Sequence, residues 1–365
     1  MVWLIILCAV AAALLLALAY LTACVGRFSF VRRLAGESKW RGRAISLAIL
    51  AAAFALLSIA LSVFNAVVVF LHAALFFLLC GLAWRIVRRV RGKEPRTDWR
   101  GWLALGLCAA WLAVGYAQCV QVRQKDYALR TDKQIGTLKI ALIADSHLGT
   151  TFDGEGFARH LKSIEAQRPD LLVIAGDFVD DASKKDDLLR ACEALGETEF
   201  PYGVWYVYGN HDAGYGGRRD FGAAELEEAL RQNGVHVLTD SYEAVGDRLI
   251  VAGRCDASSR ARLGMDALLD GADTERYILV LDHQPNDYEA EAESPADLVL
   301  SGHSHGGQLI PINRVGKWFG MLDRVYGHEK RQGTDFIVTS GISDWELLFK
   351  TGARSEYVII TVTGE

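Results

Sequence analysis

The stretch Ser301-Gly302-His303-Ser304-His305-Gly306-Gly307-Gln308 places two histidines one residue apart, directly after an apolar run at 296–300 that is typical of a short buried strand. The glycines on both sides let the backbone turn sharply at the strand end, so both imidazoles can face the same point. One loop would thus supply two metal ligands. A surface loop can carry the same residues without binding a metal, so this stretch alone leaves both interpretations open.

Four other short motifs with similar side chains also follow apolar, strand-like runs. They are Asp145-Ser146-His147, Gly176-Asp177-Phe178-Val179-Asp180, Gly209-Asn210-His211-Asp212 and Asp282-His283-Gln284-Pro285. Together with the first stretch, five strand ends carry imidazole or carboxylate groups. Open α/β sheets bind their ligands at such ends, so the pattern favours the metal-site interpretation.

The order of these motifs resembles that of the calcineurin-like metallophosphoesterases. The resemblance covers about 160 residues, from Asp145 to His305, and consists of Asp-x-His, Gly-Asp-x-x-Asp, Gly-Asn-His-Asp, His and Gly-His-x-His. Continuing similarity in Gly306-Gly307-Gln308 points to a bacterial membrane-associated subgroup that includes lipid-precursor pyrophosphatases and cell-wall phosphodiesterases. The resemblance implies a layered α-β-β-α sandwich.

The resemblance also implies a ligand set for two divalent metal ions. Carboxylate and neutral imidazole groups bind manganese, iron and zinc, and all three metals stay open. The absence of cysteine from the set disfavours a closed structural zinc site. In this sequence Asp145, His147 and His305 would hold one ion, Asn210, His283 and His303 the other, and Asp177 would bridge them. A metal-bound hydroxide would attack the phosphorus in line, and His211 would protonate the leaving oxygen or neutralise charge in the transition state.

Two aspartates beside these motifs each have two interpretations. Asp212, which we group with His211 as a catalytic candidate, orients that imidazole or caps the start of a helix. Asp180 supports the bridging carboxylate or caps the following helix. The sequence leaves both choices open.

The segment 311–331 is where the resemblance suggests substrate contact. Its cations and aromatic groups are suited to holding a phosphate beside an apolar chain, although an ordinary solvated loop is the alternative. The substrate-binding candidates are Lys317, Arg324, Tyr326 and His328. The chain departs from the subgroup at 340–346 and 354–356, which we assign to the rim of the site. The resemblance therefore does not define the substrate.

Residues 1–125 and residues 126–365 differ in composition. The first part has three acids against fifteen bases, a net charge of +12, and the second has 41 acids against 24 bases, a net charge of −17. The mean hydropathy of the whole chain, +0.16, is high for a soluble enzyme. We predict a membrane domain at 1–125 and a metallophosphoesterase domain at 126–365. Only Cys192 and Cys255 fall in the second part, and their pairing stays open.

Four segments are apolar and long enough to cross a bilayer, which takes about 20 helical residues. The first is 1–25, where a lipoprotein-like motif at 21–24 lacks the basic start of a secretory signal, so a retained helix is favoured. The run 45–84 would extend about 60 Å as one helix, twice the hydrocarbon thickness. It is therefore predicted to fold back near Ser62 and Asn65. The fourth segment is 101–122.

The loops between these segments predict the orientation. Bases gather in the first and third loops, whereas the turn near Asn65 has no charge. The bases are Arg27, Arg32, Arg33, Lys39, Arg41 and Arg43 in the first loop, and Arg85, Arg88, Arg89, Arg91, Lys93, Arg96 and Arg100 in the third. Positive loops stay cytoplasmic, so four spans predict an extracytoplasmic C-terminal domain. If 45–84 is not a hairpin, this orientation reverses.

From residue 138 onward, short β-rich runs alternate with helical stretches, which is typical of a layered α/β domain. The predicted strands are 138–144, 171–175, 204–208, 249–253, 277–281, 298–300, 336–339 and 357–362, and the predicted helices are 156–167, 186–195 and 223–232.

These observations favour a membrane-anchored phosphoesterase that cleaves a phosphodiester or pyrophosphate bond in a lipid or cell-envelope polymer. The predicted partners are the lipid bilayer and this phosphorylated substrate. A nuclease is disfavoured because a domain with a net charge of −17 repels a polyanion. A non-catalytic membrane scaffold or sensor that retains the fold is the alternative from another class.

Overall fold

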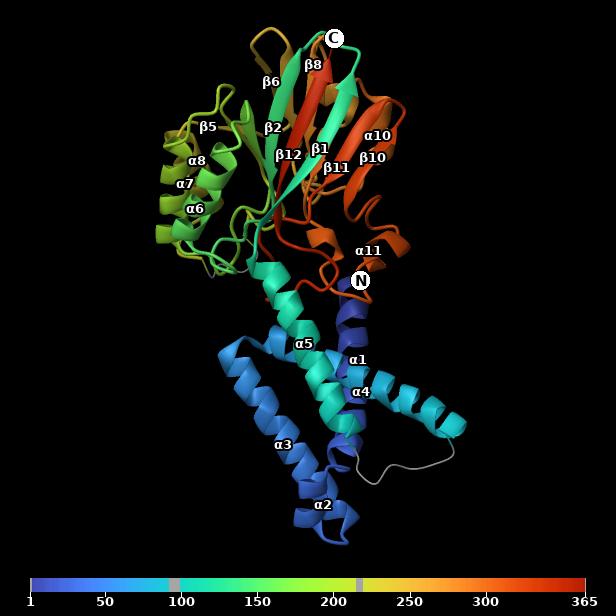
Figure 1. Ribbon diagram of the computed structural model, residues 1–365. Helices are drawn as coiled ribbons and strands as arrows, with labels where there is room; N and C mark the ends of the chain where they lie inside the picture. The colour runs from blue at the N-terminus through green and yellow to red at the C-terminus, as the bar shows by residue number, and fades with distance from the viewer. Residues whose placement is uncertain (1, 92–98, 215–218, 365) are drawn as a thin grey trace. The chain divides into compact units, whose positions relative to one another are not determined.

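The computed structural model describes residues 2–91, 99–214 and 219–364 (Figure 1). The chain divides into two compact units, Met1–Tyr116 and Ala117–Glu365. Lys93 and Arg96, which belong to the second basic loop, lie outside the described residues.

The first unit is helical. Its helices are α1 (Val2–Val25), α2 (Ser29–Ala35), α3 (Lys39–Ala60) and α4 (Val63–Arg91), followed by α5 (Arg100–Val120), whose last turn belongs to the second unit. Four of these helices, α1, α3, α4 and α5, are long and apolar enough to cross a membrane. The short helix α2 lies in the first basic loop and was not predicted.

The predicted break in the apolar run 45–84 is confirmed. Helix α3 ends at Ala60 and α4 begins at Val63. Ser62 caps the start of α4, because its Oγ accepts a hydrogen bond from the backbone N–H of Asn65 at 3.2 Å. Ser62 therefore lies between the two helices, and Asn65 lies in the first turn of α4.

The second unit contains two six-stranded sheets among its described residues. The first sheet has the order β1 (Arg123–Thr131), β12 (Glu356–Gly364), β2 (Thr137–Ile143), β3 (Leu171–Ala175), β4 (Val204–Val207) and β5 (Val235–Leu238). The second has the order β10 (Gly327–Arg331), β11 (Thr334–Val338), β9 (Leu298–Ser301), β8 (Tyr277–Leu281), β7 (Leu249–Gly253) and β6 (Ser241–Val245). Strands β2 to β5 are parallel, as are β7, β8, β9 and β11.

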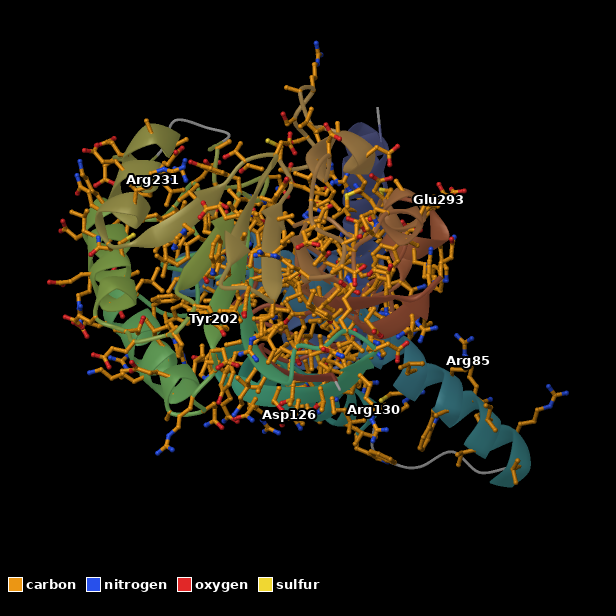
Figure 2. All side chains as sticks on the ribbon, turned by 90° about the horizontal axis from the view of Figure 1, so that it is seen from above. Arg85, Asp126, Arg130, Tyr202, Arg231 and Glu293 are labelled. Carbon is orange, nitrogen blue, oxygen red and sulfur yellow. The ribbon has the colours of Figure 1, made fainter. Side chains whose placement is uncertain are left out.

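Helices cover the outer face of each sheet. Those on the first sheet are α6 (Gly154–Glu165), α7 (Lys185–Gly196) and α8 (Ala223–Gln232), and those on the second are α9 (Met265–Leu268) and α10 (Tyr288–Glu293). A 3₁₀ turn, η1 (His305–Gly307), and α11 (Val315–Trp318) follow β9. Charged side chains such as Glu293 on α10 and Asp126 on β1 are exposed on the outside of the unit (Figure 2).

Alternating side chains divide the core into three layers. In β2, Ile140 and Leu142 pack between the two sheets, whereas Ala141 and Ile143 face the helices with Phe157 of α6. A third cluster joins the second sheet to α9 and α10. Because successive strand residues point to opposite faces, each sheet contributes to two of these layers. The predicted α-β-β-α sandwich is confirmed.

Candidate metal centre

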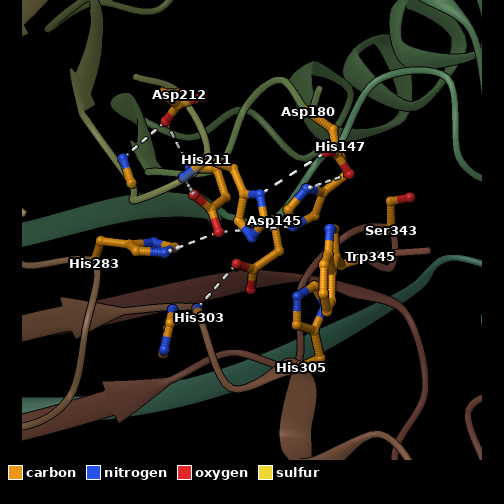
Figure 3. Close-up of polar contacts among 12 residues, drawn as sticks. Asp145, His147, Asp180, His211, Asp212, His283, His303, His305, Ser343 and Trp345 are labelled. Carbon is orange, nitrogen blue, oxygen red and sulfur yellow. Dashed lines mark hydrogen bonds and ion pairs between the residues drawn. The ribbon is translucent and has the colours of Figure 1, made fainter. Parts of the chain in front are cut away.

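Five loops at the carboxyl ends of strands carry the predicted ligands. Asp145 and His147 follow β2, Asp177 follows β3, and Asn210 follows β4 in the first sheet. In the second sheet His283 follows β8, and His303 and His305 follow β9. The structure brings the side chains of Asp145, His147, Asp177, His283, His303 and His305 together, as Figure 3 shows for all but Asp177, which carries no label there. Asn210 follows Gly209, whose backbone lies against Asp177.

The backbone is strained where it presents these groups. Asp145, His147, Asp177, His303 and His305 all have positive φ, between 37° and 67°. Each such residue costs about 1–3 kcal/mol and persists only when surrounding structure holds it, which is typical of functional sites. Here the β2 and β3 loops hold each other: Asp145 N–H donates to Gly176 O at 3.0 Å, and His147 N–H donates to Asp177 O at 3.1 Å.

The first group of ligands is Asp145, His147 and His305. One ligand atom from each lies within 4.8 Å of the others, and all three residues are buried. The rings of His147 and His305 stack with centroids 5.2 Å apart. This is the set that the family resemblance implied for one metal ion.

The second group is Asp177, His283 and His303. One ligand atom from each of these residues also lies within 4.8 Å of the others. His283 Nδ1 lies 2.8 Å from Ala175 O, so the ring directs Nε2 at Asp177 Oδ2, 3.1 Å away. The same oxygen is 3.7 Å from His147 Nε2 in the first group. Asp177, a member of the second group, therefore also contacts the first group, as a bridging carboxylate must.

Two buried side-chain oxygens test whether the candidate site fits a metal ion. Among the described residues, Asp145 Oδ2 and Asn210 Oδ1 are buried and accept no hydrogen bond. A buried acceptor left unsatisfied costs about 1–3 kcal/mol. Coordination of a cation would satisfy both oxygens, so the residues present fit divalent metal ions.

Burial and neighbouring charges set the protonation of the ligands. Burial lowers the pKa of His303 to about 4 and lowers that of His305 well below its ordinary value. Burial alone would raise the pKa of Asp177, but the imidazoles of His283 and His147 hold it below its ordinary value. Neutral imidazoles and ionised carboxylates are the forms that bind metals. Burial alone would lower the pKa of His147 and His283, but the neighbouring carboxylates raise it, so metal binding would release protons from these two rings.

Asp212 has a role that neither sequence interpretation described. Its buried carboxylate accepts hydrogen bonds from three backbone N–H groups, those of Asp177 at 2.8 Å, Val179 at 3.0 Å and Gly209 at 2.8 Å. The next described helix, α8, begins at Ala223 with Gly222 as its cap, so the helix-cap interpretation of Asp212 is wrong. Asp212 instead ties the β4 loop to the β3 loop.

Asp180 faces two imidazoles of the centre. Its Oδ2 lies 3.4 Å from His147 Nδ1, and its Oδ1 lies 3.8 Å from His211 Nδ1. Helix α7 begins at Lys185 with Lys184 as its cap, so the helix-cap interpretation of Asp180 is also wrong. The geometry places Asp180 beside the imidazoles of His147 and His211, and its support of the bridging carboxylate stays a prediction.

Two glycines let the β3 and β4 loops approach closely. A Cβ on Gly209 would lie 2.2 Å from Asp177 Oδ1 and 2.3 Å from Asp177 N. A Cβ on Gly176 would lie 2.6 Å from His283 Nδ1. Real Cβ atoms never have contacts so short, so only glycine fits at either position. Without these two side chains, the β4 loop can pack against Asp177 and His283 can pack against the β3 loop.

Asp344 is a site residue that the sequence analysis missed. It is fully buried on the loop after β11, and its Oδ1 lies 3.2 Å from His305 Nδ1. Burial raises its pKa to about 7, and Lys350 opposes this rise. The assignment of 340–346 to the rim is therefore wrong for Asp344. Its position after a strand neighbouring β9 is the signal that could have revealed it.

Asp344→Asn is expected to weaken metal binding at the first group by about 10–100-fold, because the partner of a ligating histidine fixes its orientation and basicity. Metal titration of the full chain by isothermal calorimetry measures this. Asp335→Asn is the control, because Asp335 is also buried and holds a histidine, His328 at 2.7 Å, outside the centre. Equal affinities in the two variants would contradict the assigned role of Asp344.

The structure does not bring the predicted substrate-binding residues into the metal groups. Lys317 is exposed on α11. Arg324 pairs with Glu329 at 2.5 Å, His328 contacts Asp335, and the Tyr326 hydroxyl donates to Glu356 at 2.8 Å. Their contact with substrate stays a prediction.

Comparison with known proteins gives the family. The calcineurin-like phosphoesterase profile matches residues 138–307. An uncharacterized metallophosphoesterase of Aquifex aeolicus is 30% identical over 264 residues, which cover 69% of this chain and 96% of that protein. The chain belongs to the calcineurin-like metallophosphoesterase family. It is accordingly a metal-dependent phosphoric ester hydrolase.

Two further proteins similar to this chain come from Danio rerio. A Danio rerio protein named as a transmembrane protein with a metallophosphoesterase domain is 30% identical over 251 residues, which cover 63% of this chain. The chain spans 54% of that protein's length. The crystal structure of a dimetal phosphatase from Danio rerio aligns with a TM-score of 0.38 and 11% identity, over 58% of this chain and 88% of that one.

Proposed function

We propose that the chain is a membrane-anchored phosphoesterase with two divalent metal ions, and that it hydrolyses a phosphodiester or pyrophosphate bond in a lipid or cell-envelope substrate. The observation that carries the proposal is the pair of ligand groups at the ends of four strands, β2, β3, β8 and β9, with Asp177 of the second group also bordering the first. Asp145, His147 and His305 would hold one ion, and Asn210, His283 and His303 the other.

Bound divalent ions would orient the phosphoryl oxygens, lower the pKa of the attacking water and stabilise charge on the attacking and leaving oxygens. The chain's own contribution is to fix the ligands before substrate arrives. Asp212 holds the β3 and β4 loops together, and Asp344 orients His305. A preorganised polar site avoids the cost of reorganising dipoles during the reaction.

His211 would transfer the proton to the leaving oxygen. Its ring stands 5.0 Å from that of His147 and 5.2 Å from that of Trp345, and its side chain is 15% exposed, so it borders both the ligands and the solvent. Its backbone N–H donates to Asp177 Oδ1 at 2.8 Å, which fixes the imidazole relative to the bridge. An imidazole so positioned can act as a general acid.

The membrane helices support a substrate in the bilayer. Four helices long and apolar enough to span a membrane precede the catalytic unit, and the last of them, α5, ends only three residues before β1. Such a tether confines the catalytic unit to the bilayer surface and raises the local concentration of a lipid-linked phosphate. The net charge of −17 on residues 126–365 disfavours a nucleic acid substrate.

A C-terminal alkaline phosphatase fusion is expected to be active, because the proposed topology puts the catalytic unit outside the cytoplasm. Arg27, Arg32 and Arg33 follow α1, Arg85, Arg88 and Arg89 lie at the end of α4, and the turn between α3 and α4 carries no charge. Basic loops stay in the cytoplasm. A C-terminal green fluorescent protein fusion is the matched reporter. Fluorescence with an inactive phosphatase fusion would contradict this topology.

Turnover of bis(p-nitrophenyl) phosphate by the full-length protein in detergent is expected to fall by at least ~100-fold after chelation and to return with manganese. Zinc and iron in parallel reactions would rank the metals. The substrate class is then tested by comparing turnover of lipids that contain a phosphodiester or pyrophosphate bond with turnover of water-soluble compounds that contain the same bond. Metal-independent or absent turnover would favour a non-catalytic scaffold.

A further inference from the structure

The catalytic unit concentrates its exposed apolar side chains in one segment. Among its described residues, nine large apolar side chains are exposed, and five of them fall within twelve residues: Ile310, Ile312, Trp318, Phe319 and Met321. Trp318 is 69% exposed and Phe319 is 76% exposed. Single exposed apolar residues are normal, but a concentration of this kind marks an interaction surface.

The charge of this segment is opposite to that of the domain that carries it. Residues 310–322 contain two bases, Arg314 and Lys317, and no acid. Residues 126–365 as a whole carry −17. Basic residues interspersed with tryptophan and phenylalanine are the composition of segments that lie in the interface of an anionic bilayer.

The segment is attached next to the last turn of α5, which belongs to the same unit. Ile310 N–H donates to Thr351 Oγ1 at 3.0 Å, and Thr351 N–H donates to Gln308 O at 2.9 Å. A few residues further on, Ser355 N–H donates to Gln118 O at 2.9 Å, and Ser355 Oγ donates to Cys119 O at 2.6 Å. The 350–355 segment thus links the apolar residues to the end of a candidate membrane span.

The same segment continues the loop that supplies metal ligands. His305 begins η1, Gln308 follows it, and Ser304 Oγ donates to Val325 O at 2.5 Å, so both ends of 308–325 are fixed beside the ligands. The loop that carries Trp318 and Phe319 therefore begins and ends beside the ligands.

We propose that the segment Ile310–Met321 docks the catalytic unit on the surface of the bilayer that holds the helices. The aromatic and aliphatic side chains enter the interface, and Arg314 and Lys317 contact anionic headgroups. The docked segment would hold the metal centre at the height of a lipid headgroup. The inference rests on the proposed membrane anchoring, and its test does not use turnover.

Spin labels on the full-length protein test the docking. Phe319→Cys carries the label in one variant and Ile312→Cys in a second, and Leu189→Cys on α7 is the control, because Leu189 is an exposed apolar residue of the same unit. Each is reconstituted in nanodiscs of phosphatidylethanolamine and phosphatidylglycerol. Collision with dissolved oxygen, which concentrates in lipid, is compared with collision with a water-soluble nickel chelate. The labelled unsubstituted chain supplies the background from native cysteines.

The labels at 319 and 312 are expected to have an oxygen-to-nickel collision ratio about fivefold above that of the label at 189, as for side chains in the bilayer interface. Equal ratios at all three positions would overturn the docking. So would shielding of the labels from both reagents, which indicates a protein partner or a second copy. If equal ratios or shielded labels are found while metal-dependent turnover is intact, the docking alone is refuted. If the ratios are as expected but the protein has no metal-dependent turnover, the proposed function alone is refuted.

Discussion

Asp177→Asn is expected to lower kcat/KM for a model phosphodiester by at least ~10³-fold, which corresponds to about 4 kcal/mol of transition-state stabilisation. The asparagine oxygen can still accept the N–H of His211, as Asp177 Oδ1 does at 2.8 Å. The new NH₂ group would then replace the oxygen that lies 3.1 Å from His283 Nε2 and 3.7 Å from His147 Nε2. A donor at that point cannot bridge two cations.

Asp335→Asn is the matched control for metal content, because it removes a buried carboxylate outside the centre. Plasma mass spectrometry on the same samples should find two divalent ions per chain in the control and no more than one in Asp177→Asn. A variant that keeps both ions and most of its turnover would show that Asp177 does not bridge.

His211→Ala is expected to lower kcat by about 10²–10⁴-fold without loss of metal, because the imidazole would act on the leaving group and not on the ions. The loss should be larger for a phenyl or alkyl phosphodiester than for a p-nitrophenyl phosphodiester, whose leaving oxygen needs no proton. Steady-state kinetics with the series of leaving groups measures this difference.

His236→Ala controls for the loss of a histidine elsewhere in the domain. His236 stacks on Trp205 with centroids 4.1 Å apart and pairs with Glu243 at 3.1 Å, outside the metal groups. An equal loss of kcat in His211→Ala for every leaving group would mean that His211 neutralises charge and does not donate a proton. Unchanged kcat would remove His211 from the catalytic machinery.

The interior strands could be predicted from the sequence because both of their faces are buried. Continuous apolar runs such as Leu171–Ala175 and Tyr277–Leu281 match the observed strands residue for residue. The four strands that were missed, β1, β5, β6 and β10, are the edges of the two sheets. Strand β1 includes Arg123, Lys125 and Asp126, because an edge strand needs little apolar surface and charge protects it from pairing with other chains.

The metal ligands could be predicted because their chemistry is specific and their positions follow strands. Supporting residues are harder to predict, since an aspartate that accepts backbone N–H groups looks in sequence like any capping aspartate. Asp212 illustrates this, because its three donors come from two different loops, with Asp177 and Val179 in one and Gly209 in the other. Asp344 lies 39 residues from His305 along the chain, and only the pairing of β11 with β9 brings their loops together.

The loop after β9 takes part in both the proposed metal centre and the proposed contact with the bilayer. That loop supplies His303 and His305 and continues into the exposed apolar segment 310–321. A phosphoesterase built in this way would reach a phosphate at the bilayer surface without extracting the lipid. Water-soluble esters of the same bond would then be poorer substrates because they are not concentrated there.

An anomalous difference map from crystals grown with manganese tests the central claim most directly. The account predicts two peaks about 3.5–4 Å apart, one beside Asp145, His147 and His305 and the other beside Asn210, His283 and His303, with Asp177 contacting both. A single peak, or two peaks that do not share Asp177, would contradict it.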